Sequence, residues 1–164
     1  MLNDVFTLYS AFTDKVKFLS LVKKIVEVSL QNDKEPVSSS TLDDLINIAK
    51  ETVSLWLTAT DAKEDYFSRL CLLIEVFCQL AAFGAEAYKH TLVVNGCFEF
   101  ACELTGVVKL ECDKLEQSGE WDSNAARTDP LNERVHPLAC CKTLITNLLG
   151  SLTYDSNHQV DQYF

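Results

Sequence analysis

The chain has 164 residues, of which 48% are hydrophobic and 10% aromatic, so we expect one folded domain with a real core. Five glycines and three prolines are few for a protein of many strands and tight turns. The formal net charge of −10 disfavours general binding to nucleic acid or to an anionic membrane surface. It is typical of a soluble acidic surface and points less strongly to a basic partner.

The first segment, residues 4–30, has the three-and-four spacing of apolar residues that predicts helix. The polar pair Thr13 and Asp14 predicts a break, after which the Asp14 carboxylate would cap a second helix. The apolar face of this second helix comprises Val16, Leu19, Val22, Val26 and Leu30.

A loop follows over residues 31–41, because Pro36 and a run of three serines interrupt the helical pattern. Ser40 or Thr41 would cap the next helix, which the spacing predicts over residues 42–58. Its inward positions are Leu45, Ile48 or Ala49, Thr52 and Trp56.

The strongest helical pattern covers residues 63–83. Residues 61–64 resemble a capping box in which Asp61 replaces the usual serine or threonine, and Gly84 fits a helix end. The apolar stripe comprises Phe67, Leu70, Leu73, Ile74, Phe77, Leu80 and Ala81. A stripe this wide predicts a helix buried between neighbours. Charged residues interrupt every apolar run well short of the ~20 residues needed to span a bilayer, so no membrane span is expected.

Two further helices are predicted over residues 86–94 and 97–115, separated by Asn95 and Gly96. The polar segment 117–136 then predicts a long loop. The apolar positions of the second of these helices are Phe98, Ala101, Leu104, Val108 and Leu115.

Pro137 suits the first turn of the last long helix, and a short helix would begin near Asn157. The apolar face of the long helix comprises Leu138, Cys141, Leu144, Ile145, Leu148, Leu149 and Leu152. A shift of 72 residues aligns Leu72 with Leu144, Leu73 with Ile145, Val76 with Leu148, Phe77 with Leu149, Leu80 with Leu152, Tyr88 with Val160 and Leu92 with Phe164.

This internal repeat of helix pairs predicts an all-α fold of the armadillo/HEAT-like α-solenoid kind over residues 1–164. The chain ends within a helical pattern, so we expect a fragment truncated at its C-terminus. A further repeat would then cover Leu148, Leu152 and Phe164.

The stretch from Lys142 to Tyr154, followed by Gln159, resembles the "NL" helix, polar turn and glutamine-bearing helix of armadillo repeats. It is also similar to the C-terminal conserved segment of the ataxin-10 family, which has a long polar loop before it. The matching positions are Lys142, Leu148, Leu149, Gly150, Leu152 and Tyr154, whereas Ser151 and Cys141 replace the family's asparagine and phenylalanine, and the turn to Gln159 is one residue shorter.

The resemblance implies an armadillo-like fold, self-association into a homo-oligomer and cytoplasmic location. It also implies scaffold roles around cytokinesis and neuronal survival.

The seven cysteines contain no CxxC motif, and the N-terminus has no basic region or cleavage site of a signal peptide. We therefore expect reduced thiols that act as small core residues, in cytosol or nucleus. Cys140 and Cys141 would be a buried and a half-buried thiol on one helix, and Cys97 and Cys102 do not share a tight helical face.

No metal or cofactor is expected, since the three histidines lack the spacing of a strong metal motif. These are His90, His136 and His158, of which His136 with Cys140 and Cys141 comes nearest. The paired acids Asp43–Asp44 and Glu111–Asp113 are interpreted as solvated helix surface.

No catalytic motif is present, neither a Gly-rich phosphate loop nor GxSxG nor HExxH, so we predict that the chain is not an enzyme. Trp121 either anchors a partner or folds back onto the helices, and Tyr163 and Phe164 are further candidate anchors. The sequence thus favours a non-catalytic scaffold that binds other proteins by a groove or a loop. The alternatives are a regulatory domain resembling a four-helix bundle and a Cys/His-dependent enzyme domain.

Overall fold

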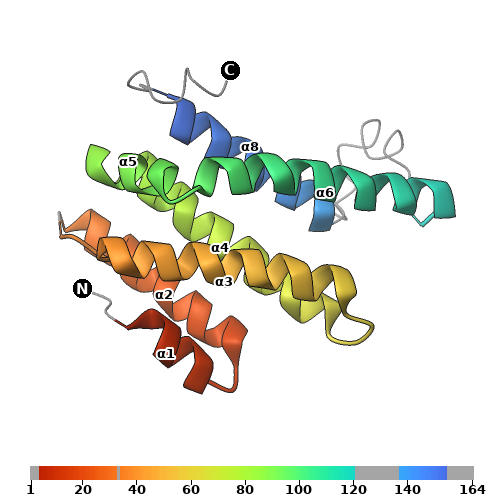
Figure 1. The fold of residues 1–164 in the computed structure, drawn as a ribbon, viewed down its shortest axis with the longest axis horizontal. Coiled ribbons are helices and arrows are strands. Elements are labelled where there is room, and N and C mark those ends of the chain that lie inside the picture. Colours follow the sequence, from red (N-terminus) through yellow and green to blue (C-terminus); the bar gives the residue numbers. More distant parts are fainter. Residues whose placement is uncertain (1–3, 33, 121–136, 155–164) are drawn as a thin grey trace.

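The computed structural model describes residues 4–32, 34–120 and 137–154, and these residues contain seven helices and no strand (Figure 1). The helices are α1 (Val5–Ala11), α2 (Lys15–Gln31), α3 (Ser39–Thr58), α4 (Lys63–Phe83), α5 (Glu86–Val94), α6 (Cys97–Ser118) and α8 (Pro137–Thr153). The prediction of an all-α fold is therefore confirmed.

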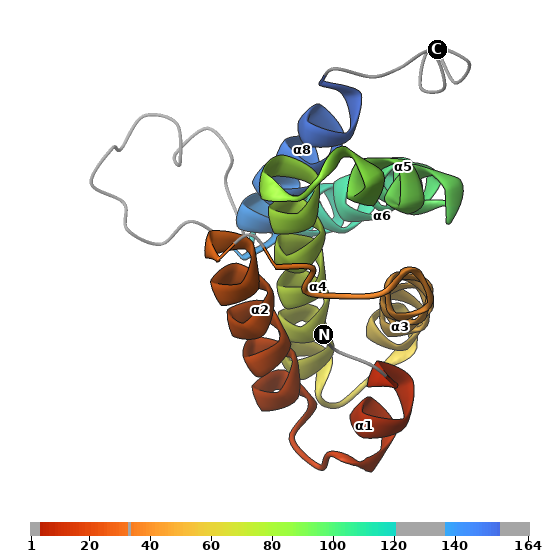
Figure 2. The same cartoon turned by 90° about the vertical axis from the view of Figure 1, so that its left-hand side faces the viewer.

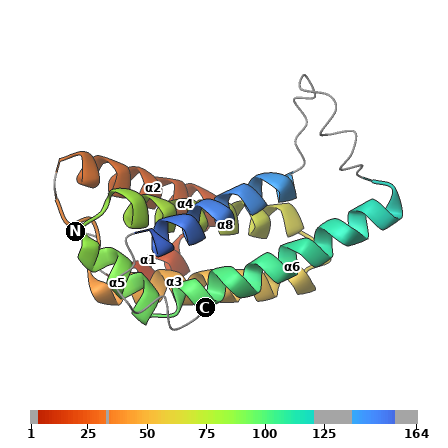
Figure 3. The same ribbon diagram turned by 90° about the horizontal axis from the view of Figure 1, so that it is seen from above.

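The helices lie in two rows. Figure 3 shows α2, α4 and α8 along one long side, with α5, α6 and α3 along the other. Within the first row α4 packs against α2 on one flank and against α8 on the other. Across the rows α3 packs on α4 and α6 packs on α8, and Figure 2 shows α2 and α3 on opposite sides of α4. The short helix α1 lies against α3 at the N-terminal end of the array.

The three helices of the first row run in the same direction. The neighbouring pairs that fix the direction are Lys23–Glu75 and Gln31–Phe83 between α2 and α4, and Phe67–Leu138 and Cys78–Leu144 between α4 and α8. In both interfaces the residue numbers rise together along the two helices, which is possible only for parallel neighbours. In the second row, α3 and α6 run antiparallel to them, because α3 and α6 end where α4 and α8 begin.

Helix α4 is the centre of the array, as its wide apolar stripe predicts. Its buried residues are Leu70, Leu73, Ile74, Val76, Phe77, Leu80 and Ala81.

Among the described residues, α4 is long and apolar enough to cross a bilayer. Helices α5 and α6 together would also be long and apolar enough, as one span bent by 65°. The charged residues Arg69 and Glu75 do interrupt the apolar sequence of α4, as expected. In this fold α4 contacts α2, α3, α5 and α8, and those contacts account for its apolar surface.

Two of the three predicted N-caps, at α3 and α4, need correction. Asp14 caps α2 as expected, since its carboxylate accepts the Lys17 amide at 2.9 Å. Helix α3 begins earlier than predicted, and its cap is Ser38 rather than Ser40 or Thr41. The predicted capping box at Asp61 is wrong, because the residue before α4 is Ala62, which adopts a left-handed conformation, and no side chain caps this helix.

The end of α4 lies at Gly84 as predicted, but the reason is space rather than a left-handed conformation. The φ angle of Gly84 is −79°, and a Cβ atom there would lie 2.4 Å from the Leu80 carbonyl oxygen and 2.7 Å from the Tyr88 ring. Helix α6 ends at Ser118, so the first residues of the predicted 117–136 loop are helical. Residues 121–136 lie outside the described residues.

Most residues that the 72-residue shift aligns have similar burial in α4 and α8, except that Phe77 is buried and Leu149 half-buried. Leu73 and Ile145, Val76 and Leu148, and Leu80 and Leu152 are all buried, whereas Leu72 and Leu144 are both half-buried. Leu148 and Leu152 are only 1% and 2% exposed, so the expectation that a further repeat must cover them is wrong. The aligned residues Val160 and Phe164, and the helix predicted near Asn157, lie outside the described residues.

Candidate functional site

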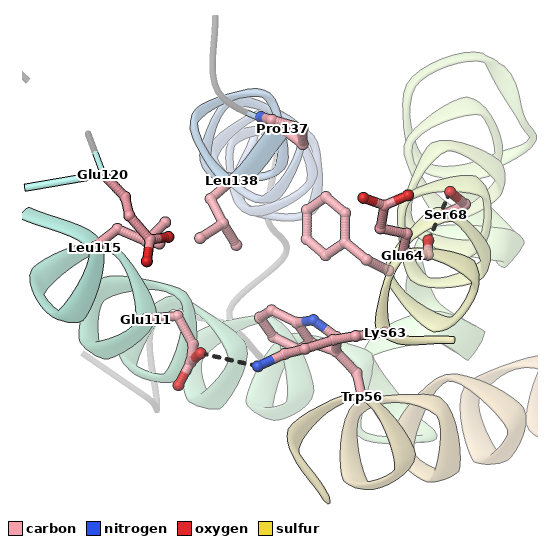
Figure 4. Close-up of a pocket in the computed structure, with 10 residues that line it drawn as sticks. Trp56, Lys63, Glu64, Ser68, Glu111, Leu115, Glu120, Pro137 and Leu138 are labelled. Carbon is pink, nitrogen blue, oxygen red and sulfur yellow. Dashed lines mark hydrogen bonds and ion pairs between the residues drawn. The ribbon is translucent and has the colours of Figure 1, made fainter. Parts of the chain in front are cut away.

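A hollow of about 700 Å³ opens where four helix ends meet, and we call it the groove. Trp56 comes from the end of α3, Phe67 from the start of α4, Leu115 from the end of α6 and Leu138 from the start of α8. The remaining lining residues are Lys63, Glu64, Ser68, Glu111, Glu120 and Pro137 (Figure 4). The volume lies within the range of pockets that bind ligands in proteins.

The floor of the groove is apolar and well packed. Trp56 is only 3% exposed, and its ring lies 5.3 Å from that of Phe67 between centroids, tilted by 44°. Leu138 is also buried, while Phe67 and Leu115 are half-buried and pack against the core. Because the floor belongs to the core, it is held in place without a ligand.

The rim of the groove is charged. Lys63 reaches across Trp56 to Glu111, and its Nζ lies 3.5 Å from Glu111 Oε2 and 5.8 Å from the Trp56 ring centroid (Figure 4). Lys114 also donates a hydrogen bond to the Glu111 carboxylate. That bond, together with the Lys63 charge, lowers the pKa of Glu111. A carboxyl group held ionised in this way is poorly suited to act as a general acid.

Two further carboxylates stand on the rim without a cation. Glu64 and Glu120 are exposed, and within the described part of the chain neither forms an ion pair. Among the described residues, the groove lining therefore holds one ammonium group, that of Lys63, and three carboxylates. This excess of negative charge surrounds the apolar floor.

Three of the seven thiols lie at the interface of α4 and α8, those of Cys71, Cys78 and Cys141. Cys71 and Cys141 share a hydrogen bond, which lowers the pKa of Cys71 and raises that of Cys141. The Cys78 thiol donates to the Leu144 carbonyl oxygen at 3.4 Å, and burial raises the pKa of Cys78 to about 11. All seven cysteines are free thiols in this structure.

The other cysteines lie partly as predicted. Cys141 is buried, but Cys140 is exposed rather than half-buried, because α8 turns that side away from α4 and α6. Cys97 is buried and Cys102 exposed, so the two do not share a face, as expected. Burial raises the pKa of the Cys97 thiol to about 12.

The predicted acids and histidines do not form a site together. Asp43 is exposed and Asp44 half-buried near the start of α3, whereas His90 is exposed on α5. No three His, Cys, Asp or Glu side chains of the described residues gather in a way that could hold a metal ion. The candidates His136, His158, Trp121, Tyr163 and Phe164 lie outside the described residues.

Glu111 is the residue that the sequence misplaced. Its side chain is only 14% exposed and lies at the groove rim, whereas the pattern predicts a solvated helix face. Trp56 lies in the core as expected and Phe67 is half-buried against it, but their second role as the floor of a hollow was missed. No sequence pattern near these residues could predict that role, because the other walls come from α6 and α8, more than 40 residues away in the chain.

Comparison with known proteins assigns this chain to no family and gives it no function. No family model, no curated protein and no solved structure matches this chain. The function must therefore be inferred from the chemistry and geometry of the groove itself.

Proposed function

We propose that this protein is a non-catalytic protein-interaction scaffold built from armadillo/HEAT-like helical repeats, and that the groove is its binding surface. The observation that carries the proposal is the meeting of four helix ends around an apolar floor with a charged rim. Protein interfaces have this anatomy, with an apolar centre enclosed by polar residues that remain in contact with water.

The order of helix packing supports the repeat architecture. The helices α2, α4 and α8 lie parallel in one row, and each of the last two pairs with the helix preceding it in the second row. In an α-solenoid each helix pair contacts mainly the pairs before and after it. A four-helix bundle, the alternative fold, would instead place its helices around one shared core at about 20° to each other.

The resemblance to the ataxin-10 family belongs to the same proposal. The matching residues from Lys142 to Leu152 lie in α8, where Leu148 and Leu152 are core positions. An amphipathic helix needs leucines at such positions in any helical array, so these two matches discriminate weakly between families. A cytoplasmic scaffold that self-associates and acts in cytokinesis remains the proposed biological role.

The chemistry around the groove favours binding over catalysis. Among the described residues, no cysteine or histidine lines the hollow, and lysines hold Glu111 ionised. The thiol of Cys71, whose pKa is lowered, forms a hydrogen bond with the Cys141 thiol in the interface of α4 and α8. A Cys/His-dependent enzyme would instead need a thiolate beside a histidine in an open site.

The test uses two tryptophan substitutions that are matched in local structure. Ser68 on α4 and Ser54 on α3 are both exposed, and each hydroxyl bonds to the carbonyl group four residues earlier. Ser68 lines the groove and Ser54 does not, so Ser68→Trp fills the groove while Ser54→Trp places the same ring elsewhere.

Affinity purification of the full chain from cell extract then compares the two variants. We expect the wild type and S54W to recover the same proteins, and S68W to lose them. If S68W recovers the same proteins as S54W, the groove is not the binding surface. In a parallel arm, residues 121–136 are replaced by a Gly-Ser linker of equal length, and loss of those proteins there but not in S68W would assign binding to that segment.

A further inference from the structure

We propose that the partner presents to the groove a basic and apolar segment, in which a lysine or arginine is adjacent to a bulky apolar side chain. This inference rests on the proposed function, since it names the chemistry of the partner that the groove accepts. It commits to a peptide segment of another protein rather than to a nucleic acid, a lipid or an acidic peptide.

The groove already holds one cation of its own. The Lys63 ammonium group lies 5.8 Å from the Trp56 ring centroid and 3.5 Å from a Glu111 oxygen. An aromatic face within about 6 Å and a carboxylate within 4 Å are the two groups that attract a cation in proteins. The site is therefore suited to positive charge, and Lys63 occupies only one part of it.

Among the described residues of the rim, carboxylates outnumber cations. Glu111 is satisfied by Lys63 and Lys114, but Glu64 and Glu120 have no ion pair within the described residues. A partner with a lysine or arginine at this rim would neutralise them, and complementary charge speeds association and excludes partners of the wrong sign. The net charge of −10 adds a longer-range attraction for a basic segment.

The apolar part of the partner would complete the floor. Phe67 and Leu115 are half-buried and face the hollow from opposite sides, one on α4 and the other on α6. A leucine or aromatic side chain placed between them would bury the remaining apolar surface of both, which favours binding. A hollow of about 700 Å³ has room for several side chains, as a short peptide would present.

Anionic occupants are disfavoured by the same groups. The described lining residues carry three carboxylates and one ammonium group, so a phosphate, a lipid headgroup or a glutamate-rich peptide would add negative charge to an acidic rim. Like charges at close range destabilise such a complex.

The experiment measures fluorescence anisotropy of the full chain with labelled six-residue peptides. The first peptide alternates arginine and leucine, and two others replace each arginine by glutamine or by glutamate. We expect the arginine peptide to bind, the glutamine peptide to bind more weakly and the glutamate peptide not to bind. S68W should abolish binding of the arginine peptide and S54W should leave it unchanged.

Two double variants that remove the same number of charges test whether the peptide binds through the rim carboxylates or through the acidic surface as a whole. E64Q/E120Q removes the two unpaired rim carboxylates, while E51Q/E103Q removes two exposed carboxylates of α3 and α6 that do not line the groove. We expect E64Q/E120Q to weaken binding about fivefold, the effect of two rim charges, and E51Q/E103Q to weaken it less than about twofold.

Equal weakening by the two double variants would overturn the inference, because binding would then reflect only the acidic surface. Failure of the proposed function has a different pattern. If S68W loses its cellular proteins but arginine-peptide binding does not depend on Glu64 and Glu120, the groove binds another chemistry and only this inference fails. If S68W also keeps its cellular proteins, both the inference and the proposed function fail.

Discussion

The two ends of α4 differ in how the neighbouring helices meet around them. At its start, the ends of α3, α6 and α8 surround the groove, and Trp56 is sunk into the floor. At its other end, Phe83 is 77% exposed between two smaller hollows of about 440 and 320 Å³. The charges beside those hollows are mixed, from Glu27, Lys34 and Glu35.

The difference shows what leaves a groove open in a helical array. At the end of α4, Gly84 lets α5 approach closely, and the Tyr88 hydroxyl donates to the Val37 carbonyl oxygen at 3.3 Å. Helix α5 therefore packs closely against that end of α4. At the start of α4, α3 packs on α4 and α6 packs on α8, so the space between the ends of α3 and α6 stays open above the floor.

The largest expected effect contrasts the aromatic residues of the two ends. Trp56→Ala should lower the free energy of unfolding by about 3–5 kcal/mol, because it leaves a cavity in the groove floor. Phe83→Ala should change it by less than about 0.5 kcal/mol, since the ring is mostly in water. Urea unfolding followed by circular dichroism measures both. Similar losses for the two variants would show that Phe83 is buried in the folded protein.

Two glycine-to-alanine substitutions test how closely α5 approaches the end of α4. Gly84→Ala should lower the free energy of unfolding by about 1–3 kcal/mol, because its Cβ would overlap the Leu80 carbonyl group and the Tyr88 ring. Gly106→Ala is the control, since nothing lies within 4 Å of a Cβ atom there, on α6. It should raise stability by up to about 1 kcal/mol, as expected for alanine within a helix. If Gly84→Ala leaves the free energy of unfolding unchanged, α5 does not lie as close to the end of α4 as the structure places it.

Alkaline pH tests the burial of Cys97, at the start of α6. Its ordinary pKa of 9.0 rises to about 12 in the folded protein, because burial disfavours the thiolate. Between these values the unfolded chain loses a proton that the folded chain keeps, so stability falls as pH rises above 9. At pH 10 the wild type should have lost about 1.4 kcal/mol through this thiol.

The Cys97→Ala variant should lack that part of the loss, whereas Cys140→Ala, at an exposed position, should keep it. The measurement is urea unfolding at pH 8 and pH 10, and the quantity compared is the change between the two pH values in each variant. An identical change in both variants would place the Cys97 thiol in contact with water.

The smallest expected effect concerns the rim of the groove. Glu111→Gln should lower the free energy of unfolding by about 0.5–1 kcal/mol at pH 7, because it removes the ion pairs with Lys63 and Lys114. The folded state lowers the pKa of this carboxyl group from 4.5, so its contribution is present above pH 4.5 and is lost as pH falls through the lowered value. Wild type and variant should therefore converge in acid, as measured by urea unfolding from pH 7 to pH 3. A constant difference would assign the effect to packing.

Local patterns predicted the helices well and their caps less well. The wide stripe from Phe67 to Ala81 predicted a central helix, because a helix with neighbours on several sides needs apolar residues on each of them. The cap of α3 was placed at Ser40 or Thr41 instead of Ser38 because every residue from 38 to 41 is a serine or threonine. Asp61 had a suitable side chain, but the backbone at Ala62 turns away before that side chain can cap α4.

The groove could not be predicted in the same way. Trp56 and Glu111 each have an ordinary explanation in their own helix, as a core residue and as a surface acid. Their meeting depends on how α3, α4, α6 and α8 pack, which is set by contacts far apart in the chain. The charge excess at the rim becomes visible only once Glu64, Glu111 and Glu120 are known to surround one hollow.

Hydrogen exchange of the full chain, with and without the alternating arginine–leucine peptide, tests the central claim most directly. The groove account predicts slower exchange at the end of α3, the start of α4, the end of α6 and the start of α8. It predicts no change at the helix ends around Phe83. Protection around Phe83, or unchanged exchange at the four helix ends when the peptide is bound, would contradict the claim that the groove is the binding surface.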